Sequence, residues 1–208
     1  MAQEKGVARF LYLSPLSTLD PSSSPGEIKT LLKEFNKEKS PYIFGKIEAE
    51  KVVWRSIMEG MPGIIINSAP VLSPYLDLNP HLNHLYTEGS AYFSHAVFNF
   101  IGIQDWVQAM IQIMESGQIG NQYILKGGST DFLELINRIN QRLGKKSPQK
   151  EVKNFGWNPF FSWTSAHLSL EQKGFQELYY LSEGQNSIFP DFHPGLFPWK
   201  FQSLEDLF

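Results

Sequence analysis

The chain has 208 residues, no cysteine and a formal net charge of −3 at pH 7. This length is enough for one generous domain with a buried core, or for one domain with a small appendage. The absence of cysteine excludes disulfides, thiol catalysis and thiolate metal sites. The slightly negative charge gives no basic field, so we expect no binding to nucleic acid or to an anionic membrane surface.

Neither a secretion signal nor a membrane span is evident in the sequence. The apolar stretch that starts at Phe10 is interrupted by Ser14, Pro15 and Ser17, and no apolar run reaches the length that a membrane requires. We therefore expect a cytoplasmic location.

The first residues predict a strand followed by a loop. Residues 7–14 (VARFLYLS) are apolar and aromatic, which indicates a short buried strand that ends at Pro15. Residues 21–26 (PSSSPG) have the composition of a loop, and residues 27–38 have the pattern of a short charged helix.

A second helix and a second strand come next. Ser40 and Pro41 have the pattern of an N-cap and a first helical residue, and Gly60 is expected to close this helix. Residues 63–68 (GIIINS) form a continuous β-branched run, typical of a strand that a parallel sheet buries on both faces.

The middle of the chain contains a long stretch without clear periodicity. Residues 73–98 are rich in Pro, Asn, His and Tyr, so we interpret them as an irregular binding loop. A short strand is expected at 100–103, then a helix that Asp105 caps and Gly117 ends.

The last regular elements complete an alternating pattern. Residues 122–126 predict a strand, and residues 129–131 are expected to cap a helix that Gly144 ends. Beyond Pro148 the sequence becomes aromatic and rich in proline, with one expected helix around 166–182. The alternation of strands and helices predicts an α/β fold with a parallel sheet.

Tyr42 and Lys46 form a Tyr-x-x-x-Lys pair on the second predicted helix. Residues four apart share one helix face, and an ammonium beside a phenol favours the phenolate. Each unit of lowered pKa corresponds to about 1.4 kcal/mol, and such a tyrosine can exchange protons near neutral pH. The pair alone is weak evidence, because it is more typical of the surface of an amphipathic helix.

Five segments, in order, are similar to the motifs of one protein family. They are GVARFLYLS (6–14), SPYIFGK with AE just after it (40–50), NSAPVLSP (67–74), NFIGIQDWVQA (99–109) and GNQYIL (120–125). They resemble the extended short-chain dehydrogenase/reductases, in the NAD-dependent epimerase/dehydratase group and its dihydroflavonol-reductase-like branch. WKFQSLEDL (199–207) resembles the end of these proteins more loosely.

The resemblance implies a fold and a division of the chain. The expected fold class is α/β, as the C-terminal part of a Rossmann-like parallel sheet with about three strands and flanking helices. Residues 1–147 would form this partial domain, with residues 73–98 as an inserted loop. Residues 148–208 would form a small, aromatic-rich substrate lobe.

The resemblance also implies catalytic residues and a cofactor. Tyr42 would donate or accept the proton at a substrate carbonyl or hydroxyl, and Lys46 would lower the pKa of Tyr42 and bind the nicotinamide ribose. The cofactor would be NAD or NADP. Four further residues would contact the nicotinamide, mostly through backbone: Ser68, Ala69, Pro70 and Val71.

A substrate pocket is implied between residues 73–98 and the segment after Phe155. Its aromatic residues suggest a small apolar or planar substrate; they are Tyr75, Tyr86, Tyr92, Trp157 and Trp163. The alternative is that these aromatic residues form a small hydrophobic core.

The sequence departs from the family pattern in its phosphate site. The family holds the dinucleotide diphosphate on a Gly-x-x-Gly-x-x-Gly turn between a strand and a helix, and this sequence contains no such turn. The family's first four strands have no counterpart, so we expect the first strand here to have an open edge. A partner chain or a second copy of this chain is expected to cover it.

Two further departures fall on the predicted site. Pro15 stands where the family has its catalytic serine, and it offers no hydroxyl. Ser14, Ser17 or Thr18 could supply that hydrogen bond, and Ser14 is the nearest. Ser68 and Ser73 replace the usual proline and glycine of the nicotinamide-facing loop, which weakens the cofactor assignment.

Three functional hypotheses follow. In the first, the protein cannot bind dinucleotide alone and is non-catalytic or dependent on a partner. In the second, it is an active NAD(P)-dependent oxidoreductase acting on a carbonyl or hydroxyl through Tyr42 and Lys46. In the third, it is a binding or scaffold module that uses an aromatic pocket without redox chemistry.

Two other constellations carry weaker signals. His81, His84 and Glu88 have a spacing that could hold a metal ion, but the segment lacks helical periodicity, so we interpret them as solvated or capping residues and expect no metal. A hydrolase is not supported, because the sequence has no Gly-x-Ser-x-Gly motif.

Overall fold

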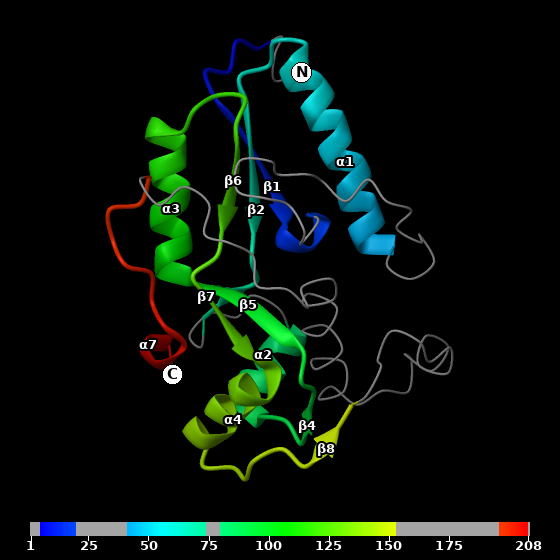
Figure 1. The fold of residues 1–208 in the computed structure, drawn as a ribbon, viewed down its shortest axis with the longest axis vertical. Helices are drawn as coiled ribbons and strands as arrows, with labels where there is room; N and C mark the ends of the chain where they lie inside the picture. The colour runs from blue at the N-terminus through cyan, green and yellow to red at the C-terminus, as the bar shows by residue number, and fades with distance from the viewer. Residues whose placement is uncertain (1–4, 20–40, 74–79, 153–195, 208) are drawn as a thin grey trace.

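The computed structural model describes residues 5–19, 41–73, 80–152 and 196–207. A three-stranded parallel sheet, ordered β1-β2-β6, lies between helix α1 on one side and helix α3 on the other (Figure 1). The bounds are β1 Phe10–Pro15, β2 Gly63–Ser68, β6 Gln122–Leu125, α1 Pro41–Met58 and α3 Ile103–Ser116. This arrangement confirms the predicted α/β class.

Strand β2 is the centre of the parallel sheet. All six of its residues are buried, as the β-branched run predicted. On one side it pairs with β1 from Phe10↔Gly63 to Pro15↔Ser68, and on the other it pairs with β6. The predicted first strand was shifted: β1 begins at Phe10 rather than at residue 7, because its partner begins only at Gly63.

Helix α1 begins at Pro41, as predicted, since proline lacks the N–H that a first helical residue leaves unpaired. Ile43 and Ile47 are buried, at 2% and 3% exposed. The helix ends at Met58, and Gly60 follows in the left-handed region with φ of 99°. A short 3-10 turn, η1 Leu16–Thr18, contacts α1 after β1.

A second region lies beyond the carboxyl ends of the parallel strands (Figure 1). Its mixed sheet is ordered β3-β5-β7, and β4 pairs with β8. The bounds are β3 Val71–Leu72, β4 Tyr92–Phe93, β5 Val97–Gly102, β7 Gly128–Asp131, β8 Lys150–Glu151, α2 Pro80–Glu88, α4 Phe132–Arg142 and α7 Leu204–Leu207. Phe98 and Phe132 meet edge to face in its core, with ring centroids 5.7 Å apart.

The stretch predicted as an irregular loop at 73–98 contains regular structure. Helix α2, strand β4 and the start of β5 all fall inside it. Leu85 of α2 is fully buried against the core of the second region. The helix was missed because His, Asn and Thr occupy four of its nine positions, so its apolar periodicity is short.

Of three predictions about helix caps and strand pairing, one is confirmed and two are wrong. Asp131 caps α4 as predicted, since its carboxylate accepts a hydrogen bond from the Leu133 N–H at 2.7 Å. Asp105 does not cap α3: the N-cap is Gly102, and Asp105 lies buried in the first turn. The strand expected at 100–103 does not join the parallel sheet: it is the end of β5, which lies in the separate mixed sheet and pairs antiparallel with β7.

A buried asparagine fixes the turn after α2. Asn140 of α4 accepts a hydrogen bond from the Ser90 N–H at 2.9 Å and donates to the Ser90 and Lys146 carbonyls at 2.7 and 2.9 Å. Gly89 has φ of 67°, and a Cβ there would lie 2.3 Å from the Asn140 Oδ1. Only glycine fits this close turn without strain.

Some predictions lie outside the described residues. They include the helices at 27–38 and 166–182, most of the predicted lobe at 148–208, and the aromatic residues Tyr75, Trp157 and Trp163. The proposed division at residue 147 stays a prediction. Among the described residues, no helix has the length and apolar character needed to cross a membrane.

Candidate functional site

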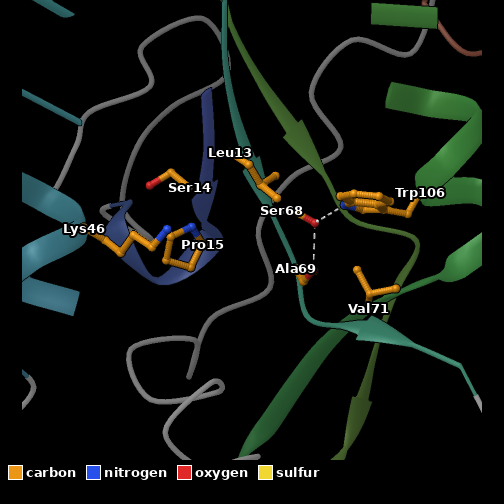
Figure 2. Close-up of a pocket in the computed structure, with 8 residues that line it drawn as sticks. All are labelled: Leu13, Ser14, Pro15, Lys46, Ser68, Ala69, Val71 and Trp106. Carbon is orange, nitrogen blue, oxygen red and sulfur yellow. Dashed lines mark hydrogen bonds between the residues drawn. The ribbon is translucent and has the colours of Figure 1, made fainter. Parts of the chain in front are cut away.

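A pocket of about 170 Å³ opens at the carboxyl ends of β1 and β2. Ser14 and Pro15 end β1, and Ser68 ends β2, so the backbone itself brings these residues to one edge of the sheet. Ligands of open parallel sheets bind outside this edge. The full lining is Leu13, Ser14, Pro15, Lys46, Ser68, Ala69, Val71 and Trp106 (Figure 2).

Lys46 enters the pocket from α1, on the side opposite Trp106 (Figure 2). Its ammonium lies 6.0 Å from the centroid of the Tyr12 ring, at the outer limit of a cation–π contact. Tyr42 lies one turn earlier on the same helix, so the two predicted residues share a face of α1. The side chain of Tyr42 is outside the described part of the structure.

Ser14 lines the pocket, while its two alternatives do not. The Ser14 hydroxyl lies 3.3 Å from the Thr18 hydroxyl. Ser17 and Thr18 are buried in η1 and absent from the lining. Of the three candidate hydroxyls, that of Ser14 therefore belongs to a pocket-lining residue, and its catalytic role stays a prediction.

The predicted cofactor-binding segment lies at the same pocket except for one residue. Ser68, Ala69 and Val71 line it, whereas Pro70 does not; the Pro70 carbonyl instead accepts a hydrogen bond from the Ile101 N–H at 3.1 Å. Trp106 of α3 also lines it, and the sequence did not single out this residue.

The Ser68 hydroxyl is held by two hydrogen bonds inside the protein. It donates to the Ala69 carbonyl at 2.8 Å and accepts from the Trp106 indole N–H at 3.1 Å, as Figure 2 shows. The one hydroxyl proton of Ser68 is donated to Ala69, and one lone pair remains on the oxygen. Ser68 can therefore only accept a hydrogen bond from a ligand while these bonds are kept.

A polar network lies behind the pocket, between α1 and the sheet. Its centre is the carboxylate of Glu50, which is 0% exposed. Glu50 Oε2 accepts hydrogen bonds from Thr18 Oγ1 at 3.1 Å and Asn67 Nδ2 at 3.2 Å, and Glu50 Oε1 accepts from Gln122 Nε2 at 3.0 Å. The amides also join each other, since Gln122 donates to the Asn67 Oδ1 at 2.6 Å.

Sequence reasoning gave Glu50 only a place in the resemblance and missed Asn67 and Gln122 as its partners. One signal could have found them: a polar residue inside a strand predicted to be buried on both faces needs a hydrogen-bonding partner. Asn67 follows three isoleucines of β2 directly.

The histidine constellation and the aromatic residues are the remaining features that the sequence pointed to. No group of three His, Cys, Asp or Glu side chains among the described residues is placed to hold a metal ion. Tyr86 and Tyr92 pack against the core of the second region, as the alternative interpretation of the aromatic residues expected. Burial raises the pKa of Tyr86, which keeps its phenol neutral.

Comparisons with known proteins give a fold and no close relative. No protein-family model and no curated protein matches the sequence. Among solved structures, a nucleoside-diphosphate-sugar epimerase from Pseudomonas aeruginosa is similar over 99% of this chain and 66% of its own, with a TM-score of 0.71 and 19% identity.

Two NAD complexes show the same architecture. A UDP-glucuronic acid 4-epimerase from Bacillus cereus has a TM-score of 0.58 and 16% identity, and a dTDP-glucose 4,6-dehydratase from Bacillus anthracis has a TM-score of 0.54 and 15% identity. Each is similar over 88% of this chain, which spans 64% of their length. The chain thus shares the Rossmann-like fold of these enzymes.

Proposed function

We propose that this chain carries the nicotinamide-facing half of an NAD(P)-dependent site of the epimerase, dehydratase or reductase type. The observation that supports the proposal is the convergence of five predicted residues on one pocket: Ser14, Lys46, Ser68, Ala69 and Val71. These residues come from three separate segments of the sequence. The NAD complexes among the similar structures favour the same cofactor class.

The chemistry assigned to this half-site is proton transfer beside a hydride carrier. NAD(P), when bound, would supply the hydride acceptor or donor. Lys46 would hold the ribose hydroxyls and favour the phenolate of Tyr42, which would exchange a proton with the substrate. The similarity to nucleoside-diphosphate-sugar enzymes favours a substrate that reacts at a hydroxyl or a carbonyl.

The proposal includes dependence on a second polypeptide or segment for the rest of the dinucleotide. The sequence has no Gly-x-x-Gly-x-x-Gly turn, so its backbone offers no such cradle for a diphosphate. The pocket of about 170 Å³ is also small beside sites for drug-sized ligands, which range from about 300 to 1,000 Å³.

Calorimetric titration with three probes tests this half-site. We expect NADH and reduced nicotinamide mononucleotide to bind this chain with dissociation constants within about tenfold of each other, and AMP not to bind. Lys46→Met should weaken both nicotinamide ligands by about tenfold or more. Lys51→Met is the matched control, since Lys51 is on the same helix, 44% exposed and paired with Glu48.

Two outcomes would overturn the proposal in different ways. If neither nicotinamide ligand binds, the cofactor assignment fails. If NADH binds about 100-fold more tightly than the mononucleotide, the chain holds the whole dinucleotide and the half-site is wrong. That second result would favour the active oxidoreductase, in which Tyr42→Phe should abolish turnover and leave the fold intact.

A further inference from the structure

Three of the four groups in the polar network behind the pocket, Glu50, Asn67 and Thr18, are close in the sequence or in space to a residue that lines it. Glu50 follows Lys46 by one turn of α1. Asn67 directly precedes Ser68 on β2, and Thr18 lies 3.3 Å from Ser14 through their hydroxyls. The Glu50 carboxylate therefore joins the three segments that supply the polar lining of the pocket.

Apolar packing alone does not fix how α1 sits on the sheet. Ile43 and Ile47 bury the helix against the strands, but apolar contacts are non-directional and tolerate small sliding or rotation. Hydrogen bonds weaken steeply when distance or angle departs from the optimum. Three such bonds to one carboxylate set a single register for the helix.

A gain in folding stability does not explain why the Glu50 carboxylate is buried between α1 and the sheet. Taking a carboxylate wholly out of water is costly, and buried charged networks are often no more stabilising than apolar residues of the same size. Glu50 is fully buried, and the neutral side chains of Thr18, Asn67 and Gln122 are among its hydrogen-bond donors. The geometry that it imposes is a better reason for its presence.

We propose that Glu50 is a positioning residue, whose buried carboxylate holds Lys46 at a fixed place relative to Ser14 and Ser68. Displacements of about 1 Å in a reactive site can reduce rates by about 100-fold, so this control matters for the pocket. The inference rests on the proposed function for its effect on NADH, whereas the effect on helix placement is independent of any ligand.

Spin labels measure the placement of α1 directly. The chain has no cysteine, so cysteines introduced at Val52 of α1 and Ile111 of α3, 63% and 53% exposed, would be the only labelling sites. In the 208-residue chain, Glu50→Gln should broaden or shift the distance distribution between the labels. Glu48→Gln, an exposed carboxylate on the same helix, is the matched control and should leave it unchanged.

A paired substitution separates positioning from general destabilisation. In Glu50→Gln/Asn67→Asp the new amide can donate to the new carboxylate, which also accepts from Gln122 and Thr18. This variant should restore the wild-type distance distribution. NADH affinity should follow the same order, with a loss of about tenfold in Glu50→Gln and recovery in the pair. If the wild type does not bind NADH, the proposed function fails while the distances still test the positioning.

Two results would contradict the role of Glu50. One is an unchanged distance distribution in Glu50→Gln. The other is a changed distribution that the paired variant does not restore, since that identifies a merely structural loss. If Glu50→Gln does not fold, Thr18→Val decides the question: it removes one donor at constant volume, and an unchanged distance distribution would again refute the role.

Discussion

The two regions of the molecule each contain a buried polar centre, but the centres have different partners. Asn140, in the second region, bonds to the backbone of Ser90 and Lys146. Glu50, beside the parallel sheet, bonds to the side chains of Thr18, Asn67 and Gln122. The first centre borders the turn after α2, and the second borders the pocket.

This difference distinguishes a buried polar residue that the fold requires from buried polar residues that serve the pocket. Backbone N–H and C=O groups exist whatever the sequence, so a buried turn needs a partner such as Asn140. The polar side chains around Glu50 need hydrogen-bonding partners only because they are themselves polar and buried. Apolar residues at the same positions would need no such partners. A network of that kind needs a reason other than stability, and the pocket provides one.

The largest expected effect on stability is that of Asn140→Ala. It leaves the buried Ser90 backbone groups without their partner, and we expect a loss of about 3 kcal/mol in the free energy of unfolding. Urea denaturation measures this loss. Gln141→Ala, at the exposed next position, should cost less than about 0.5 kcal/mol. NADH binding should be unchanged, and a loss of binding would contradict the separation of the two centres.

Asn67→Ala should reduce the free energy of unfolding less than Asn140→Ala does, and it should weaken NADH binding more. The Glu50 carboxylate keeps Gln122 and Thr18 as donors, so we expect a loss of about 2 kcal/mol. The same variant should weaken NADH by about tenfold, since Asn67 adjoins Ser68. Denaturation and calorimetry on one preparation check both values, and intact NADH affinity would refute the link between network and pocket.

An apolar replacement of the network should be almost neutral for stability. In the triple variant Glu50→Met/Asn67→Leu/Gln122→Met, the Thr18 hydroxyl can donate its one proton to the Pro15 carbonyl, 2.9 Å away, in place of Glu50. We expect unfolding free energy within about 1 kcal/mol of the wild type, together with lost NADH binding. A loss much larger than that of Asn67→Ala would show that the network is needed for folding.

The smallest expected effect is a pH dependence from Asp105, a third buried polar group, which like Asn140 bonds to backbone. Burial raises the pKa of Asp105, and the hydrogen bond from the Gln202 N–H at 2.6 Å opposes that shift. Between the ordinary pKa of aspartate, about 3.9, and this raised value, the unfolded chain ionises first. Stability contributed by Asp105 therefore falls as pH rises through that window.

Asp105→Asn should remove this fall, and urea unfolding at a series of pH values measures it. Asp206→Asn is the control of opposite sign. Hydrogen bonds from the Ser203 hydroxyl and N–H lower the pKa of Asp206, so its contribution rises as pH rises through the range between the lowered and the ordinary value. If both substitutions changed the slope of unfolding free energy against pH in the same direction relative to the wild type, these assignments would be contradicted.

Local sequence predicted much of the parallel region. The isoleucine run gave β2 with its bounds, Pro41 gave the start of α1, and Gly117 gave the end of α3. The second region was predicted less well. Helix α2 and the antiparallel strand β7 depend on contacts with distant residues: the apolar pattern of α2 is short, and β7 (GSTD) has no apolar side chain.

The candidate site shows the same division. Tyr42 and Lys46 could be singled out because their spacing on one helix is a property of the sequence alone. Trp106 could not, because its role at the pocket depends on α3 lying across the sheet from α1 (Figure 1). No pattern in the sequence around Trp106 indicates its hydrogen bond to Ser68, which is 38 positions away.

By itself, the sequence determined the local elements, the absence of a glycine-rich diphosphate turn and the residues that resemble a catalytic helix. Only the tertiary structure decided that Glu50 is the centre of a network, because its donors Asn67, Thr18 and Gln122 are 17, 32 and 72 positions away. Helical and strand periodicity follow from the geometry of neighbouring residues. Side-chain hydrogen bonds over such separations depend on how the packed elements align in space.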